Sequence, residues 1–173
     1  MRRGIVIAAS IVLMVAAIAF ILVEFQKKQH NYEKYKTIPV FSFETIFNKI
    51  KSTSSLPKHE GYVILIFSPG CEACQMEASD YSKHIESMQN IFFLMVSTDS
   101  LSKIGDFALK QQLYNADNFQ FGHVDANEFE THFGSVPIPS IFIYNSEKEL
   151  ISKTRVANSL TLLKYFKNEL TDW

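Results

Sequence analysis

The chain has 173 residues, a net charge of −1 and two cysteines. This length suits one ordinary domain with an appendage, and two cysteines are too few for a disulfide-built scaffold. No basic stripe stands out from the acidic residues, so we expect no nucleic-acid partner.

The N-terminal segment carries no charged residue from Ile5 to Val23. As a helix this stretch would span roughly 28 Å, close to the ~30 Å thickness of the hydrocarbon core of a bilayer. We therefore expect residues 1–23 to be a membrane anchor that contacts the lipid bilayer through residues 5–23. A cleaved signal peptide is the alternative, because Ala17-Ile18-Ala19 offers a cleavage site.

The orientation of this anchor is judged from the flanking charges. Arg2 and Arg3 favour a cytoplasmic N-terminus, whereas lysines within residues 27–36 lean the other way. A very short tail followed directly by an apolar stretch is typical of an export signal. We expect a single-pass protein of the cell membrane, with its folded domain on the extracytoplasmic (periplasmic) side.

After the anchor, residues 24–37 are polar and charged and predict a tether, and residues 38–173 form the predicted domain. Residues 48–61 have the composition of a loop. Apolar and β-branched runs predict strands at 39–43, 62–67, 91–96, 119–124, 140–144 and 149–156.

Helices are predicted between these strands. Cys74, Ala78, Tyr81, Ile85 and Met88 recur at helical spacing on one face. Further helices are expected at 101–114, 126–133 and about 158–170, the last with Leu160, Leu163, Phe166 and Leu170 facing the sheet. Strands that alternate with helices and end in a hairpin predict an α/β fold with a mixed sheet.

Both cysteines lie in the stretch FSPGCEACQMEASDY, residues 67–81. The pattern places Cys71 at the start of a helix and Cys74 one turn later on its buried face. Free backbone N–H groups and the positive end of the helix dipole favour a thiolate at Cys71, which makes it the nucleophile. Cys74 would then resolve the mixed disulfide.

Two other interpretations of the pair remain open. A zinc site needs about four ligands, and neither a second Cys-x-x-Cys nor a paired histidine motif is present, although His123 and His132 are candidates. A purely structural disulfide closing so small a loop would constrain the unfolded chain little. The residues favour a redox dithiol.

A buried strand, a Cys-x-x-Cys that opens a helix, and VPIPS before an apolar strand resemble the thioredoxin superfamily. Within it, FSPGCEACQME is similar to the membrane-tethered TlpA/ResA-type thiol-disulfide oxidoreductases, and the resemblance covers roughly residues 38–173. It implies a thioredoxin-like fold in which helices flank a central mixed sheet, with an inserted strand–helix unit before a cis-proline. We expect no cofactor and no metal ion.

The resemblance also implies roles for single residues. Cys71 would be the attacking cysteine and Cys74 the resolving one, and Glu77 would pass protons during exchange with a pKa raised by its surroundings. Pro139 would be the cis-proline facing the cysteines, and Ile138 before it would offer its backbone to a substrate chain. Simpler alternatives are a solvated Glu77 on the helix surface and prolines that only punctuate the strand, with Pro137 a competitor for the cis-proline.

Three positions depart from the family pattern. Gly70 replaces the usual aromatic residue before the first cysteine, Leu65 stands where many thioredoxins bury an acid, and Ser79 replaces a helix-kinking proline. These departures put partner choice and electron-transfer efficiency in question, not the fold.

Glu72, between the cysteines, adds a negative charge that should raise the pKa of Cys71 and make the couple more reducing. The predicted function is reduction of disulfides in protein substrates, with electrons from a membrane or envelope donor. The resemblance associates such reduction with cytochrome c assembly. The alternatives are a copper metallochaperone that uses Cys71, Cys74 and a histidine, and a thiol oxidase or isomerase.

Overall fold

The structure is a computed structural model that describes residues 13–23 and 33–169. The chain separates into two compact units, Met1–Lys36 and Thr37–Trp173. The first unit contains a helix at residues 13–23 whose large apolar side chains, such as Leu13 and Phe20, are exposed. In the described part of the chain, no helix has both the length and the apolar character needed to cross a membrane. Residues 5–12 of the predicted span, and residues 24–32 of the predicted tether, lie outside the described residues.

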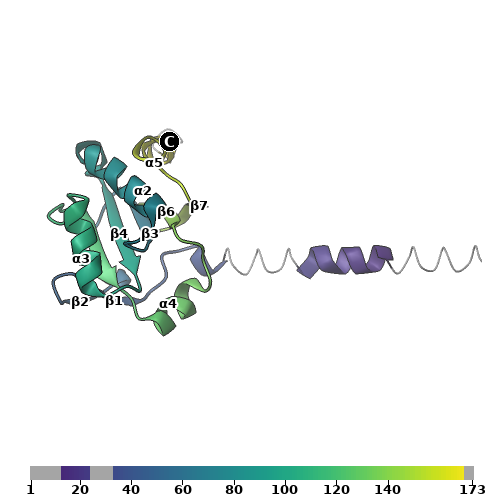
Figure 1. The fold of residues 1–173 in the computed structure, drawn as a ribbon. Helices are drawn as coiled ribbons and strands as arrows, with labels where there is room; N and C mark the ends of the chain where they lie inside the picture. Colours follow the sequence, from purple (N-terminus) through teal and green to yellow (C-terminus); the bar gives the residue numbers. More distant parts are fainter. Residues whose placement is uncertain (1–12, 24–32, 170–173) are drawn as a thin grey trace, which may run out of the picture. The chain divides into compact units, whose positions relative to one another are not determined.

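The second unit is built on a seven-stranded sheet flanked by helices (Figure 1). The strands are β1 (Ser42–Thr45), β2 (Ile50–Ser52), β3 (Gly61–Ile66), β4 (Ile91–Ser97), β5 (Phe119–His123), β6 (Ser140–Asn145) and β7 (Leu150–Thr154). The helices are α2 (Glu72–Lys83), α3 (Leu101–Lys110), α4 (Ala126–Phe133) and α5 (Ser159–Glu169), with short 3-10 turns η1 (Thr53–Ser55) and η2 (Ile85–Met88).

The strand order is β2-β1-β5-β4-β3-β6-β7. β4 runs parallel to β3 and β5, whereas β1, β6 and β7 pair antiparallel with their neighbours. The predicted mixed sheet of a thioredoxin-like α/β fold is therefore confirmed. β5 and α4 occupy the positions of the expected inserted strand and helix, between α3 and the loop that leads to β6.

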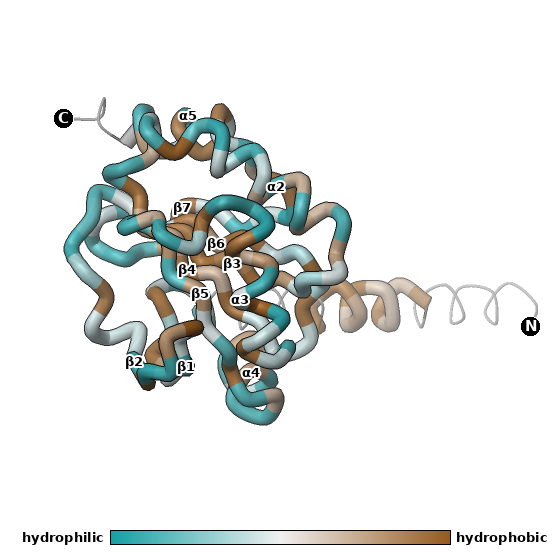
Figure 2. The backbone as a smooth tube through the Cα atoms, turned by 60° about the vertical axis from the view of Figure 1, so that its left-hand side comes forward, coloured by the Kyte–Doolittle hydropathy of each residue, from teal (hydrophilic) through white to brown (hydrophobic). Residues whose placement is uncertain are grey.

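The central strands β3 and β4 are buried on both faces, as expected for continuous apolar runs. One face packs Val63, Leu65 and Phe93 against α2, α3 and α5 in the main core cluster. On the other face Phe133 of α4 contacts Phe142 of β6, with ring centroids 5.9 Å apart. Figure 2 shows the hydrophobic strands gathered inside and hydrophilic residues along the outer helices.

Two predictions about local structure are wrong. The predicted loop 48–61 contains β2 and η1, because residues 50–52 pair with β1 as an edge strand. Leu160 is 64% exposed, while Leu162 is fully buried and takes the inward position on α5. Leu163 and Phe166 pack at the border of the core as expected, and Leu170 lies outside the described residues.

Candidate redox site

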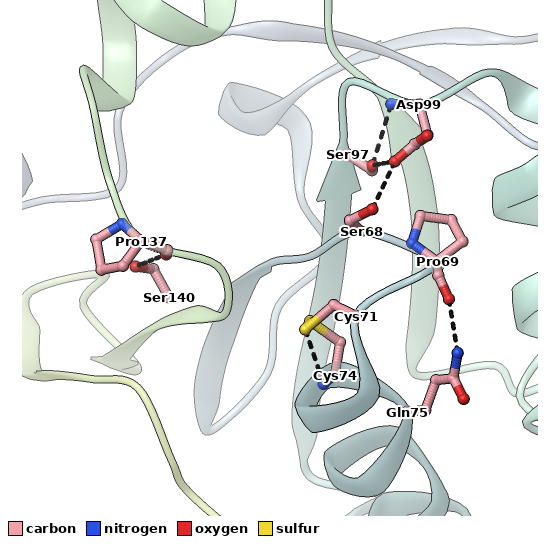
Figure 3. Close-up of a disulfide and its surroundings, with 9 residues drawn as sticks. All are labelled: Ser68, Pro69, Cys71, Cys74, Gln75, Ser97, Asp99, Pro137 and Ser140. Carbon is pink, nitrogen blue, oxygen red and sulfur yellow. Dashed lines mark hydrogen bonds between the residues drawn. A yellow bond between two sulfur atoms is a disulfide. The ribbon is translucent and has the colours of Figure 1, made fainter.

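The two cysteines lie where β3 passes into α2 (Figure 3). Cys71 is the N-cap residue of α2, and its sulfur accepts a hydrogen bond from the Cys74 backbone N–H at 3.2 Å. The two residues form a disulfide with a Cα–Cα distance of 5.2 Å. Cys71 is half-buried, whereas Cys74 is fully buried against the core. One sulfur is therefore accessible and the other shielded, as a nucleophile and a resolving thiol require.

The turn that carries Cys71 is held by side chains that pattern analysis of the sequence did not single out. The Ser68 hydroxyl donates to Asp99 Oδ2 at 2.9 Å, which ties the end of β3 to the end of β4. The Gln75 side-chain amide donates to the carbonyl oxygen of Pro69 at 2.8 Å. The only sequence signal for these contacts is that Ser68 and Asp99 each follow a buried strand. These bonds fix the position of Cys71 before any substrate arrives.

The segment before β6 lies at the same edge of the sheet. Ser140, the first residue of β6, pairs with Ile66, the last residue of β3. The Ile138–Pro139 peptide bond is cis, so the prediction of a cis-proline at Pro139 rather than Pro137 is confirmed. Pro139 is buried and Ile138 is 44% exposed, and the Ser140 hydroxyl donates to the Pro137 carbonyl at 2.6 Å. The roles of Ile138 and Pro139 in substrate binding stay predictions.

Glu77 is buried, at 7% exposure, so it is not a solvated surface residue. Its Oε1 accepts a hydrogen bond from the Ala157 backbone N–H at 3.1 Å, at the start of the segment that leads into α5. Its Oε2 is buried with no hydrogen-bond partner among the described residues. Burial raises the pKa of Glu77, against the smaller opposing effect of the Ala157 hydrogen bond. The carboxyl therefore meets the expectation of a raised pKa, while its part in proton transfer stays a prediction.

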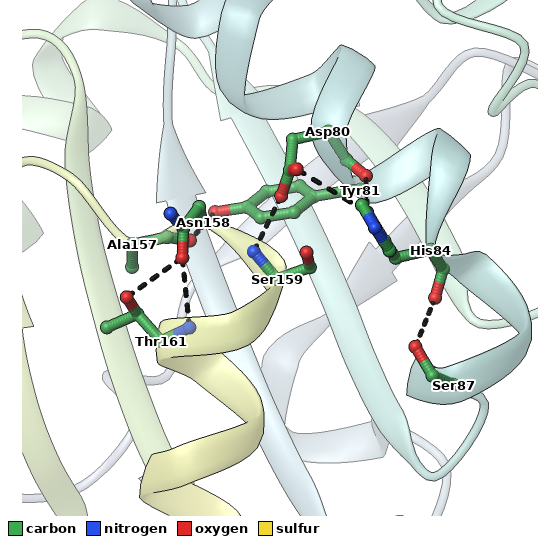
Figure 4. Close-up of polar contacts among 8 residues, drawn as sticks. All are labelled: Asp80, Tyr81, His84, Ser87, Ala157, Asn158, Ser159 and Thr161. Atoms are coloured by element: carbon green, nitrogen blue, oxygen red, sulfur yellow. Dashed lines mark hydrogen bonds and ion pairs between the residues drawn. The ribbon is translucent and has the colours of Figure 1, made fainter.

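Neighbouring side chains of α2 hold the same segment (Figure 4). The Tyr81 hydroxyl donates to the Ala157 carbonyl at 2.7 Å, and Asp80 Oδ2 accepts from the Ser159 backbone N–H at 2.6 Å. Burial is the main cause that raises the pKa of Tyr81 well above its ordinary range, so this hydroxyl keeps its proton. The start of α5 is thus held against α2, the helix of the cysteines, by hydrogen bonds to Glu77, Asp80 and Tyr81.

The described residues contain no group of three or more His, Cys, Asp or Glu side chains arranged to hold a metal ion. His123 Nδ1 lies 2.8 Å from the carbonyl oxygen of Asp99, and the His132 ring packs 5.7 Å from that of Phe41. Neither of these contacts involves Cys71 or Cys74. Leu65, which stands where many thioredoxins bury an acid, is fully buried in the main core cluster.

Solved structures with this fold include several proteins named for thiol-disulfide chemistry. A secreted Mycobacterium tuberculosis disulfide oxidoreductase, described as homologous to E. coli DsbE, shares 16% identity with this chain, with a TM-score of 0.62 over 79% of this chain and 98% of its own. A thioredoxin-family thiol:disulfide interchange protein from Chlorobium tepidum TLS shares 17%, with a TM-score of 0.63 over 78% and 96%. The thioredoxin domain of a Bacteroides vulgatus thiol-disulfide oxidoreductase shares 13%, with a TM-score of 0.62 over 79% and 97%. At these identities the likeness shows the fold alone.

A search of curated proteins finds no match to this chain. The model of the AhpC/TSA family matches residues 35–153, a range that includes both cysteines, Glu77, Ile138 and Pro139. Since this match spans most of the chain, the protein belongs to the AhpC/TSA family, and its predicted class, a thioredoxin-like thiol-disulfide oxidoreductase, is confirmed.

Proposed function

We propose that this protein is a membrane-anchored reductase of disulfides in extracytoplasmic proteins, of the TlpA/ResA type. The observation that carries the proposal is the pairing of a half-buried Cys71 at a helix N-terminus with a fully buried Cys74. An accessible sulfur with a shielded partner suits attack on a disulfide followed by release. The assay that tests it is reduction of insulin disulfides by the full-length protein.

The exchange has two steps. In the reduced protein the Cys71 thiolate attacks one sulfur of the substrate disulfide, the substrate S–S bond breaks, and one substrate thiolate leaves. Cys74 loses its proton and attacks the Cys71 sulfur, which breaks the mixed disulfide, releases the second substrate thiolate and forms the Cys71–Cys74 disulfide. The substrate gains two electrons, and a dithiol donor at the membrane restores the reduced pair.

Glu72 supports the reducing direction. It is exposed in the first turn of α2, directly after Cys71. Its negative charge opposes the favourable effect of the helix N-terminus on the Cys71 thiolate. A less stabilised thiolate means a less stabilised reduced form, and such a couple gives up its electrons more readily.

Gly70 supports access to the site by a protein substrate. A Cβ placed on Gly70 would contact nothing within 4 Å, so the space beside Cys71 is open. Met76, on the exposed face of α2, is 64% exposed and Ile138 is 44% exposed. Exposed apolar side chains on α2 and before the cis-proline suit contact with an unfolded or extended substrate chain.

Anchoring and orientation are tested in cells that express the full-length protein. We expect the protein to stay in membranes after an alkaline wash, and Cys71 to react with a membrane-impermeant maleimide after reduction of intact cells. Arginine at both Val15 and Ile18 should release it, because each charge within the span costs about 2.5–3.5 kcal/mol. Leucine at both positions is the matched control. Release of the wild-type protein by the wash, or labelling only after lysis, would contradict the anchor or its orientation.

A further inference from the structure

A recess of about 360 Å³ opens where the central strands end and α4 begins. Its apolar wall includes Ile66, Phe67, Phe129 and Ile138. The volume is in the range of small-ligand sites, which are about 300–1,000 Å³. Apolar walls of this kind suit the stem of one long side chain.

Glu130 is the single charged residue in the lining of this recess. It lies on α4 and is exposed. The ion pairs found among the described residues join His84 to Asp80 and Lys103 to Asp99, and Glu130 belongs to neither. An apolar recess with one acidic group complements a side chain with an apolar stem and a basic end.

The recess lies beside the path expected for a substrate. Ile138 is part of its wall and directly precedes the cis-proline. Ile66 is part of its wall and pairs with Ser140, directly after that proline. Phe67 starts the short segment that leads to Cys71. A substrate chain that runs along Ile138 with its cysteine at Cys71 therefore brings a neighbouring side chain to the recess.

We propose that this recess binds a lysine or arginine side chain next to the reactive cysteine of the protein substrate. The stem packs against Phe129 and Ile138, and the basic end lies near Glu130. Glu130 is thus a specificity-determining residue for the reductase. This inference rests on the proposed function, because it assigns the recess to a substrate of the same dithiol.

The test uses the full-length protein in detergent, with dithiothreitol as the electron source. The substrates are three cyclic disulfide peptides that differ only in the residue beside one cysteine: lysine, glutamate or norleucine. We expect the kcat/KM of the lysine peptide to exceed that of the glutamate peptide about fivefold, mainly through KM. At this partly exposed site the Glu130 carboxylate attracts the lysine side chain and repels the glutamate side chain, and the two effects add. Glu130→Lys should reverse this order.

Glu86→Lys is the matched control, since it makes the same charge change at an exposed position in η2 and should keep the order. The rate with hydroxyethyl disulfide, which has no side chain, should be the same in Glu86→Lys and in the wild type. Equal kcat/KM for the three peptides, or a norleucine preference that Glu130→Lys leaves unchanged, would overturn the basic-residue assignment alone. If the wild type reduces neither the peptides nor hydroxyethyl disulfide, the proposed function fails as well.

Discussion

Replacing Cys71 with serine should reduce insulin-disulfide reduction by the full-length protein to background, a loss on the order of a thousandfold or more. Cys71 is the half-buried sulfur at the start of α2, and Cys74 is fully buried beneath it. A serine hydroxyl is not ionised at neutral pH and forms no mixed disulfide with the substrate. The measurement is the turbidity of precipitating insulin chains, with dithiothreitol as the electron source.

Cys74→Ser is the matched control, since it removes the other sulfur of the pair and keeps the nucleophile. This variant should still attack a substrate but stop at the mixed disulfide, which a non-reducing gel detects as a covalent adduct. Full turnover by Cys71→Ser, or an adduct on Cys74 in that variant, would show that Cys71 is not the attacking residue.

Replacing Glu77 with glutamine should slow disulfide reduction by about a hundredfold, the lower end of the range for general acid–base catalysis. The carboxyl is buried, its Oε2 lacks a partner among the described residues, and burial raises its pKa. If Glu77 takes the proton of Cys74, the rate of the wild type must rise with pH through the raised pKa. The glutamine variant should lack that rise, which a pH profile of kcat measures.

The pH dependence of the free energy of unfolding gives an independent test of the raised pKa of Glu77. A carboxyl whose pKa is raised by folding contributes stability that is fully present below its ordinary value of 4.5 and is lost as pH rises through the folded-state pKa. The wild type should therefore lose stability relative to Glu77→Gln across that window in urea unfolding.

Asp80→Asn is the control for the hydrogen bonds that hold the start of α5 against α2, because the Asp80 carboxylate accepts one of them from the Ser159 backbone N–H. It should alter stability and keep the pH rise in kcat. An unchanged pH profile in Glu77→Gln would remove Glu77 from the proton path and leave it a structural role.

The sheet centre was predictable because β3 and β4 are short, continuous apolar runs, a pattern that strands buried on both faces produce. β2 was not, because it is an edge strand with exposed residues such as Ile50, and its sequence resembles that of the surrounding loop. On α5, leucines occupy positions 160, 162 and 163, so the periodicity alone did not single out Leu162 as the inward residue.

The cysteines and the cis-proline were predictable because each belongs to a short local pattern. The surroundings of Glu77 were not predictable from such a pattern. Ala157, whose N–H donates to the Glu77 carboxylate, is 80 residues away in the sequence and reaches Glu77 only when α5 packs beside α2. The bond from Ser68 to Asp99 likewise depends on the parallel pairing of β3 and β4, which places the two loops together. Contacts set by the sheet topology leave little trace in local sequence patterns.

The reduction potential of the Cys71–Cys74 couple tests the central claim most directly. It is obtained by titrating the full-length protein in detergent against glutathione redox buffers and following the disulfide by thiol labelling. We expect a value near or below about −250 mV, in the range of thioredoxin-type reductants. A value near about −120 mV, as in the strongest dithiol oxidants, would contradict the reducing role, and failure of the pair to form a disulfide would contradict the redox site itself.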